Sequence, residues 1–391
     1  MKAWRKLPRT VWLLGFVSLC NDAASEMVYP LIPLYLASVL MAGPKVLGLI
    51  EGIAEACSSL MKLLSGYLSD RMQRQKAWIL SGYGLAALVR PLYVLVVGWL
   101  GVLLLRFLDR IGKGLRSAPR DAMLSHAVSI EQRGMAFGFH RAMDNLGAVL
   151  GPLMASLLLA KGLALPHLFW LAGFLGVLAV LMAAFVRDPE LPGVKRKALD
   201  LQRPLQHRPL RRFLWVLGLF TLGNSSNMFL LLRAKELDLS DSQIPLLWAA
   251  VAAIAALGST PLSALSDRIG RKSLMVSGWL IYAALYFWMA SGKLQGSGIW
   301  VWFLMFGAYQ AATEGVEKAM VADLSPAELR GSAFGWYYLI SGAALLPASL
   351  MFGWFYQSIG PQWAFSCGAG LALLATVLLV VWVPVPKPSQ P

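Results

Sequence analysis

Long runs of apolar residues, separated by short polar segments, follow one another along almost the whole chain. Most runs reach the roughly 20 residues that an α-helix needs to cross the hydrocarbon core of a membrane. The pattern predicts twelve membrane-spanning helices, at residues 11–40, 44–66, 77–97, 99–118, 134–160, 166–186, 212–232, 242–263, 273–292, 298–319, 332–356 and 363–384.

The longest polar break, from Arg187 to Arg212, is rich in proline and basic residues and divides the predicted helices into two sets of six. We therefore predict an all-α polytopic membrane protein. Its predicted parts are an N-terminal six-helix bundle at 1–187, a cytoplasmic basic linker at 188–211, and a C-terminal six-helix bundle with a short tail at 212–391.

The composition narrows the class of protein. Of the 391 residues, 58% are apolar and 14% are charged, whereas a soluble domain is about a quarter charged. Such a chain is not a disordered protein, a disulfide scaffold or a collagen-like fibre. Cys20, Cys57 and Cys367 lie in apolar stretches without metal-ligand spacing, and we interpret them as packing thiols.

Lysine and arginine are distributed unevenly between the two sides of the predicted helices. Of the 35, 26 fall on the side of the termini and the linker, five on the opposite side, and four inside the helices. Cytoplasmic loops are enriched in these residues, so both termini are predicted to be cytoplasmic, in a plasma membrane such as the bacterial inner membrane. The net charge of +15 then indicates loops beside a lipid bilayer and no nucleic-acid partner.

The two sets of predicted helices contain an internal repeat. The Asp-Arg pair at 70–71 recurs 197 residues later at 267–268, and the segment 133–138 recurs as 330–335 at the same offset. A repeat of six spans in one orientation predicts pseudo-symmetric halves related by an axis along the membrane normal. In such proteins the substrate site lies between the halves, near the membrane midplane.

Two polar segments carry a family signature. Gly66 to Lys76 and Ser263 to Lys272 resemble the loop G-x-x-x-D-R/K-x-G-R/K-x-R/K of the major facilitator superfamily (MFS) of secondary transporters, although Gln73 replaces one of its glycines. The resemblance implies the MFS fold of two pseudo-symmetric six-helix bundles. It also implies gradient-driven transport by alternating access, without ATP.

In the family, these segments act as a gate on the cytoplasmic side, and an acidic group at a helix end can pair there with arginines. We expect Asp70 to meet Arg116, Arg120 or residues near Arg330. The alternative is a plain basic turn. The predicted gate residues are Gly66, Asp70, Arg71, Arg74, Arg116, Arg120, Asp267, Arg268, Gly270, Arg271 and Arg330.

The predicted helix 134–160 contains Gly147, Gly151 and Pro152. Small residues one turn apart let two helices approach closely, and a proline inside a helix removes a backbone hydrogen bond. This element resembles the G-x-x-x-G-P motif of the family's exchangers, which implies antiport; ordinary close packing is the alternative.

Ionisable residues at membrane depth are costly and therefore functional candidates. Asp22 and Glu26 lie one helical turn apart, and two neighbouring carboxyl groups favour the retention of one proton, which suits a proton carrier. His140 and Asp144 have the spacing of a proton relay or of a structural pair. Neutralisation of each charge by a structural partner is the alternative throughout. The predicted proton-coupling residues are Asp22, Glu26, Glu55, Arg106, Asp109, His140, Arg141 and Asp144; among them Arg106 resembles a family arginine that takes part in proton coupling.

The second half of the chain is poorer in charge and offers mainly neutral hydrogen-bonding side chains. We therefore expect the N-terminal half to handle protons and the C-terminal half mainly to shape contacts with the substrate. The predicted substrate-cavity residues are Asn21, Glu51, Asn224, Asn227, Tyr309, Gln310 and Glu314.

The sequence favours a proton-coupled transporter that exports a small organic solute by antiport. The alternative is a proton symporter that imports a metabolite or siderophore. The expected partners are the lipid bilayer, a small-molecule substrate and protons, with the protein a monomer and without cofactor or metal. A sensor is disfavoured because there is no soluble domain to relay a signal. An enzyme is disfavoured because the sequence has no nucleophile–base constellation and no P-loop.

Overall fold

The computed structural model describes residues 7–72, 74–129, 132–188, 203–325 and 330–384, and within these ranges its regular elements are all helical. The first part contains α1 (Arg9–Val28), α2 (Leu31–Ser38), α3 (Pro44–Met72), α4 (Gln75–Val89), the 3-10 helix η2 (Pro91–Leu95), α5 (Trp99–His126), α6 (Arg133–Ala160) and α7 (Leu165–Ala184). The second part contains α8 (Arg203–Gln206), α9 (Arg208–Gly223), α10 (Met228–Glu236), α11 (Gln243–Ile269), α12 (Arg271–Ala290), α13 (Ser297–Asp323), α14 (Arg330–Ser358) and α15 (Pro361–Trp382).

Within the described ranges, eight helical stretches are long and apolar enough to cross a membrane. The helices α1, α3, α5 and α13 are also at least 20 residues long, but ionisable side chains lower their mean hydropathy. The count of twelve spans and the cytoplasmic position of the termini stay predictions. Most of the predicted basic linker and the end of the tail lie outside the described residues.

Several expected boundaries were wrong: α5 continues to His126 beyond the predicted 99–118, and the predicted 77–97 and 212–232 are each interrupted. Two differences affect the site region most. The stretch 11–40 forms two helices, α1 and α2, with Pro30 between them, because proline has no backbone N–H to continue the helical ladder. The helix predicted at 44–66 continues to Met72, so Asp70 and Arg71 lie in the last turns of α3 and not in a loop.

The chain forms two compact units. Unit 1 comprises the described residues of Met1–Ala42, Ile53–Lys195 and Leu230–Ala252, and unit 2 comprises the remaining described residues. The start of α3 therefore belongs to unit 2, and most of α10 belongs to unit 1. The predicted division of the chain at the linker stays a prediction.

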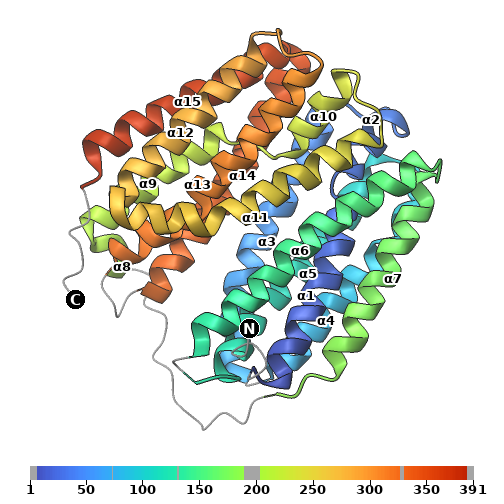
Figure 1. Ribbon diagram of the computed structural model, residues 1–391, viewed down its shortest axis with the longest axis vertical. Helices are drawn as coiled ribbons and strands as arrows, with labels where there is room; N and C mark the ends of the chain where they lie inside the picture. Colours follow the sequence, from blue (N-terminus) through green and yellow to red (C-terminus); the bar gives the residue numbers. More distant parts are fainter. Residues whose placement is uncertain (1–6, 73, 130–131, 189–202, 326–329, 385–391) are drawn as a thin grey trace. The chain divides into compact units, whose positions relative to one another are not determined.

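Each unit is built from long helices that pack along one another (Figure 1). In unit 1, α1 packs against α6 and α7, while α4 packs against α5 and α7. In unit 2, α12 packs against α13 and α15, while α9 packs against α14 and α15. The two units thus use corresponding helices in corresponding pairs, as the sequence repeat requires.

A pair of lysines shows the repeat at the level of single contacts. The Nζ atom of Lys76 donates a hydrogen bond of 2.6 Å to the carbonyl oxygen of Ala184, at the end of α7. Lys272, 196 residues further on, donates bonds of 2.9 and 2.7 Å to the carbonyl oxygens of Val380 and Val383, at the end of α15. An ammonium group is favourable there because unpaired carbonyls give a helix C-terminus a partial negative charge.

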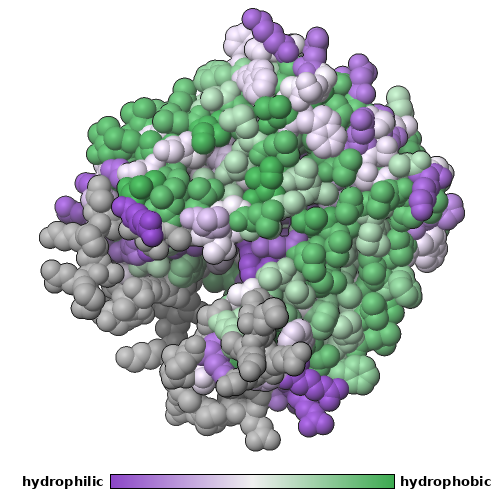
Figure 2. Space-filling view, in the orientation of Figure 1, coloured by the Kyte–Doolittle hydropathy of each residue, from purple (hydrophilic) through white to green (hydrophobic). Residues whose placement is uncertain are grey.

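Large parts of the surface of each unit are apolar. Figure 2 shows extended hydrophobic surfaces over the helices of each unit, and large apolar side chains such as Trp170, Phe174, Trp363 and Val381 are exposed. Water-exposed patches of this extent are rare in soluble monomers. These faces therefore contact lipid, and the charged side chains inside the units are the ones that need explanation.

Candidate functional site

Helix α5 carries a row of basic and polar side chains on one face. The row follows the alternating spacing of three and four residues that keeps side chains on one side of a helix. Its members are Arg106, Arg110, Lys113, Ser117 and Arg120. Side chains of α1 and α3 contact this row, and α6 is connected to it through Ser18 of α1. Unit 1 thus brings several of the predicted proton-coupling residues together.

Asp109 lies between two arginines in the interior of unit 1. Its Oδ1 atom is 3.5 Å from Nη2 of Arg90, and its Oδ2 atom is 3.7 Å from Nη1 of Arg106. Arg90 also donates a hydrogen bond of 2.9 Å to Oδ1 of Asn21. None of these four residues is more than 6% exposed. Buried ions persist only when opposite charges and hydrogen bonds offset the cost of desolvation, so this cluster ties α1, α4 and α5 together.

Glu55 of α3 forms a close ion pair with the row. Its Oε1 atom is 2.7 Å from Nη2 of Arg110, which is 5% exposed. A charge-assisted bond of this length fixes both side chains. The permanent charge of Arg110 thus neutralises Glu55. This is the alternative to a role in proton coupling: a charge held by a structural partner.

Asp22 and Glu26 have different surroundings from Glu55. The amide of Asn21 donates a hydrogen bond of 3.0 Å to Oδ1 of Asp22, and the indole Nε1 of Trp248 donates one of 3.1 Å to Oε2 of Glu26. The ring of Trp248 stacks on Tyr29, with 5.4 Å between centroids. Among the described residues, neither carboxyl group forms an ion pair; both are held by neutral donors, half-buried in α1.

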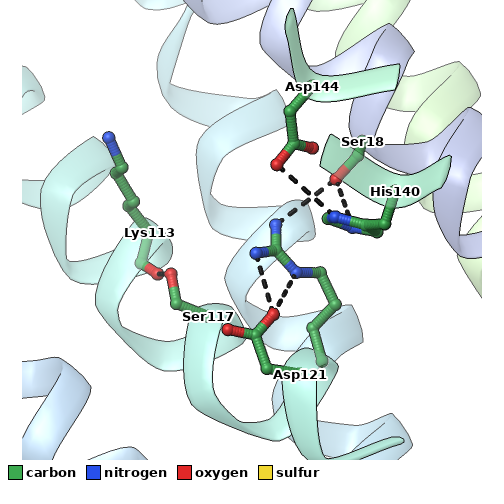
Figure 3. Close-up of polar contacts among 7 residues, drawn as sticks. Ser18, Lys113, Ser117, Asp121, His140 and Asp144 are labelled. Atoms are coloured by element: carbon green, nitrogen blue, oxygen red, sulfur yellow. Dashed lines mark hydrogen bonds and ion pairs between the residues drawn. The ribbon is translucent and has the colours of Figure 1, made fainter. Parts of the chain in front are cut away.

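His140 lies in a chain of polar contacts that links α5, α1 and α6 (Figure 3). Its Nε2 atom is 2.9 Å from the hydroxyl of Ser18, and its Nδ1 atom is 3.4 Å from Oδ2 of Asp144. Arg120 donates a bond of 3.3 Å to the same Ser18 hydroxyl and is 3.0 Å from Oδ1 of Asp121. Since an imidazole and a hydroxyl both donate and accept, the chain can pass a proton between Ser18 of α1 and Asp144 of α6, while Arg120 of α5 only donates.

The glycines of α6 lie directly against the backbone of α1. A Cβ atom on Gly147 would be 2.6 Å from the carbonyl oxygen of Leu19, and one on Gly151 would overlap the carbonyl oxygen of Ala23. Pro152 lies inside α6, next to this contact. The missing side chains therefore let α1 approach α6 closely and place Asp22 at the interface between the two helices.

The helical backbone is interrupted at the end of α9 of unit 2. α9 and α10 belong to one apolar stretch, but the backbone at 224–227 between them is not helical. The hydroxyl of Tyr282 donates a bond of 2.9 Å to the carbonyl oxygen of Gly223, at the end of α9. The Ser226 hydroxyl accepts a bond of 3.3 Å from the N–H of Met228 and donates one of 3.2 Å to Glu51, which is 1% exposed. A backbone carbonyl at the end of α9 and a backbone N–H at the start of α10 thus have hydrogen-bond partners within the protein. Non-helical backbone at membrane depth needs such partners because lipid offers none.

The other predicted cavity residues have mixed surroundings. Tyr309 is buried among aromatic rings, with its ring centroid 5.0 Å from that of Tyr282. Asn224, Asn227 and Gln310 are half-buried. Glu314 is exposed and lies 3.4 Å from Nζ of Lys318.

One acidic residue of α13 was not assigned to the site from the sequence. Glu317 accepts a hydrogen bond of 3.3 Å from the hydroxyl of Tyr337 in α14. These two positions are 197 residues after Arg120 and His140, the same offset as the sequence repeat. The offset alone was a signal that could have identified the pair.

Two predicted gate arginines lie in the interior of unit 1. Arg116 is buried, with its guanidinium carbon 4.7 Å from the ring centroid of Tyr83, and Arg120 contacts Ser18 and Asp121 as described above. Arg271 pairs with Asp323 at the end of α13.

The remaining predicted gate residues, and one predicted proton-coupling residue, either lie at the surface or have side chains that the structure does not describe. Gly270 has a φ of 91°, a backbone conformation that glycine adopts without strain, between α11 and α12. Arg74, Arg141 and Arg268 are exposed. The side chains of five gate residues are outside the description, so the expected partners of Asp70 stay predictions: Gly66, Asp70, Arg71, Asp267 and Arg330.

Several further residues of the network were not assigned to the site from the sequence. Arg110 and Lys113 follow Arg106 at helical spacing, which was a usable signal. Ser18, Arg90, Asp121 and Trp248 become relevant only through contacts between helices. Within the described ranges, no group of three His, Cys, Asp or Glu side chains is placed to hold a metal ion.

The pseudo-repeated helical architecture can be compared with known families. The family model of the Major Facilitator Superfamily matches residues 14–233 and again residues 213–391, and so covers both halves of the repeat. The chain belongs to the Major Facilitator Superfamily. The resemblance inferred from the polar segments 66–76 and 263–272 is thereby confirmed.

Relatives within this superfamily match the MFS chain from end to end. An uncharacterised MFS-type transporter of Methanocaldococcus jannaschii is 34% identical over 383 residues, covering 96% of this chain and 95% of the relative. The multidrug resistance protein MdtG of Salmonella paratyphi C is 25% identical over 387 residues, covering 96% and 94%. A solved POT family transporter in complex with a thioalcohol-conjugated peptide has a TM-score of 0.81 at 14% identity, over 96% of both chains. The MFS chain is accordingly a membrane transporter of small solutes and not an enzyme.

Proposed function

We propose that this MFS transporter is proton-coupled and exports a small organic solute, with Asp22 and Glu26 of α1 as the carriers of the coupling proton. The observation that supports this most directly is the set of hydrogen bonds to these two carboxyl groups. Their partners, Asn21 and Trp248, are neutral donors. A carboxyl group held in this way can gain or lose a proton without leaving a buried cation unpaired.

The other ionisable residues then have supporting roles. Glu55 and Asp109 stay ionised because Arg110, Arg90 and Arg106 hold them. His140 lies between Ser18 of α1 and Asp144 of α6, and it relays protons between these two helices. In this proposal, the paired residues keep a constant charge, and only a few residues exchange protons. The constant charges shift the proton affinity of the residues that exchange protons.

Two observations support export over import. The first is the close contact of Gly147 and Gly151 with α1, in the element that resembles an exchanger motif. The second is the end-to-end similarity to MdtG, a multidrug resistance protein. Import of a metabolite or siderophore by proton symport is the alternative, and the sign of the proton movement separates the two.

The test uses purified protein in liposomes with an acidic lumen and a trapped pH-sensitive dye. Lipophilic cations, ferric siderophores, sugars, amino acids and organic anions are added outside, one class at a time. An antiporter moves protons out as solute enters, so at least one class is expected to make the lumen more alkaline. Asp22→Asn combined with Glu26→Gln is expected to abolish the signal, whereas the exposed Glu236→Gln is the control.

The same probes distinguish export from import by binding. In an antiporter, protons and solute compete, so stabilisation by a ligand is expected to be stronger at about pH 8 than at about pH 6. A symporter gives the opposite order. Solute movement without any change in lumen pH, or an unchanged signal in the double variant, would show that the coupling proposal is wrong.

A further inference from the structure

Lys113 is an unusual lysine because of its position. It lies about 21 Å from the start of α5, at 1.5 Å per residue, and thus near the middle of a helix of 28 residues. Among the described residues, its ammonium group forms no hydrogen bond and no ion pair. Figure 3 shows the group directed away from the cluster around Ser18 and His140. A lysine at membrane depth faces a water-filled cavity or a partner.

Arg116, one helical turn further along α5, is a second cation that forms no ion pair with the residues the structure describes. It is 4% exposed, and its Nη1 atom has no hydrogen-bond partner within the described ranges. Its contact with the ring of Tyr83 covers the flat face of the guanidinium group and provides no acceptor for the Nη1 donors. A buried, unsatisfied donor costs free energy, which a ligand that accepts a hydrogen bond would recover.

Contacts on either side place Lys113 and Arg116 along the segment of α1 that carries Asp22 and Glu26. The guanidinium carbon of Arg106 lies 5.3 Å from the ring centroid of Tyr29, and Arg120 bonds to the Ser18 hydroxyl. Asp22 and Glu26 lie between these two contacts on α1, and Lys113 and Arg116 lie between them on α5. Glu55 is also near Lys113, but it is already paired with Arg110. Among the described residues, no two of the four groups form a hydrogen bond or an ion pair, so each keeps bonding capacity for a ligand.

We propose that this site in unit 1, formed by Asp22, Glu26, Lys113 and Arg116, binds a zwitterionic solute that carries both an ammonium and a carboxylate group. The ammonium group binds between Asp22 and Glu26, and the carboxylate accepts hydrogen bonds from Lys113 and Arg116. Tyr29 and Trp248, stacked beside Glu26, offer an aromatic surface to the rest of the molecule. This inference rests on the proposed function and names the substrate class of the same site.

Charge balance argues against a purely cationic or purely anionic solute. A cation alone would satisfy the carboxyl groups and leave Lys113 and Arg116 without partners. An anion alone would do the reverse. Only a molecule with both charges satisfies all four side chains, and buried groups left unpaired are the main source of discrimination between ligands.

The test compares ligands that differ in charge alone. Three zwitterions (phenylalanine, 4-aminobutyrate and the dipeptide Ala-Phe) are each matched with the corresponding amide, which is a cation, and with the acid lacking the amino group, which is an anion. Ligand-induced thermal stabilisation of the detergent-solubilised full chain is measured at fixed pH. At least one zwitterion is expected to bind about tenfold more tightly than both of its matched counterparts.

Variants assign the preference to its residues. Lys113→Gln is expected to weaken zwitterion binding about tenfold but amide binding less than about threefold. Lys113→Arg, which keeps the charge, is expected to retain the preference, and Lys161→Gln, an exposed lysine of the same unit, is the matched control. Asp22→Asn is expected to remove the preference for the zwitterion over the matched acid, which provides a second variant if Lys113→Gln does not fold.

The proposal is overturned if no zwitterion is preferred over its counterparts, or if Lys113→Gln and Lys161→Gln bind alike. The measurement needs no proton gradient. A zwitterion preference without proton movement in liposomes would therefore refute the coupling mechanism alone, while proton movement driven by a cation with no role for Lys113 would refute the substrate class alone.

Discussion

Helices α5 and α13 occupy corresponding places in the two halves of the repeat, yet their interiors differ. At the offset of 197 residues, Arg106 and Asp109 of α5 correspond to Phe303 and Phe306 of α13. The first pair belongs to a buried network of charges, and the second to a cluster of stacked rings, with 5.4 Å between the centroids of Phe306 and Trp302. One helical framework thus accepts either ion pairs or aromatic packing.

The difference extends to the neighbouring helices. Arg120 and His140 both contact the Ser18 hydroxyl, whereas their counterparts Glu317 and Tyr337 contact each other. Aromatic packing holds a fixed shape, while groups that gain and lose protons change their interactions with pH. The comparison supports the proposal that proton coupling lies mainly in unit 1, while in the corresponding part of unit 2 Glu317 is the carboxyl group bonded to a neutral hydroxyl.

The largest expected effect comes from Asp109→Asn. The substitution leaves the guanidinium groups of Arg90 and Arg106 buried without their anion, which is expected to lower the free energy of unfolding by about 3 to 5 kcal/mol. Its counterpart Phe306→Leu loses part of an aromatic contact, at about 1 kcal/mol. Thermal unfolding in detergent measures both. Equal losses would show that the charge network contributes no more than the ring cluster.

A second comparison concerns how closely the helices pack. Gly147 and Gly151 of α6 correspond to Ala344 and Ala348 of α14. Gly151→Ala is expected to cost about 1 to 3 kcal/mol, because the new methyl group overlaps the backbone of α1.

The control for this substitution lies on the same helix. Gly138→Ala places its methyl group in open space and is expected to be neutral or to stabilise the protein by up to about 1 kcal/mol. Thermal unfolding of both variants checks the pair. If Gly151→Ala were as stable as Gly138→Ala, the close approach of α1 and α6 would not be required.

A third comparison separates proton relay from structure. His140→Gln and Tyr337→Phe each remove a side-chain hydrogen bond and are expected to cost about 1 kcal/mol. Only His140→Gln is expected to slow solute-driven proton movement in liposomes, since an amide cannot accept and release a proton between Ser18 and Asp144. Unchanged proton movement would assign His140 a structural role.

The smallest expected effect tests the symmetry itself. Lys76→Ala and Lys272→Ala each remove a cation from a helix C-terminus and are expected to lower stability by similar amounts, about 0.3 to 1 kcal/mol. Parallel thermal unfolding of the two variants measures this. A clear loss in one variant and none in the other would mean that the repeat is not equivalent at these helix ends.

The helices and the family were predictable because both depend on local pattern. Membrane-length apolar runs, the offset of 197 residues and the polar segments at 66–76 and 263–272 are all visible in the chain. The ends of the elements were less predictable. Pro30 divides a run that hydrophobicity alone joins, and α3 continues to Met72 because a helix does not end where its apolar run ends.

The candidate site was predictable only in part. The spacing of Asp22 and Glu26, and that of His140 and Asp144, placed each pair on one helix face. The partner that holds Glu26 was not predictable, because Trp248 lies 222 residues away in the sequence. Arg110 was visible as part of the α5 row, but its role depends on Glu55 of another helix.

The sequence by itself determined that this protein is a helical membrane transporter with an internal repeat, because hydrophobic period, charge placement and signature segments are local properties. The tertiary structure decided which charges neutralise one another. Asp109 and Glu55 are paired with arginines, whereas Asp22 and Glu26 accept hydrogen bonds from neutral donors. Such pairing depends on distances between helices, and no spacing along a single helix specifies those distances.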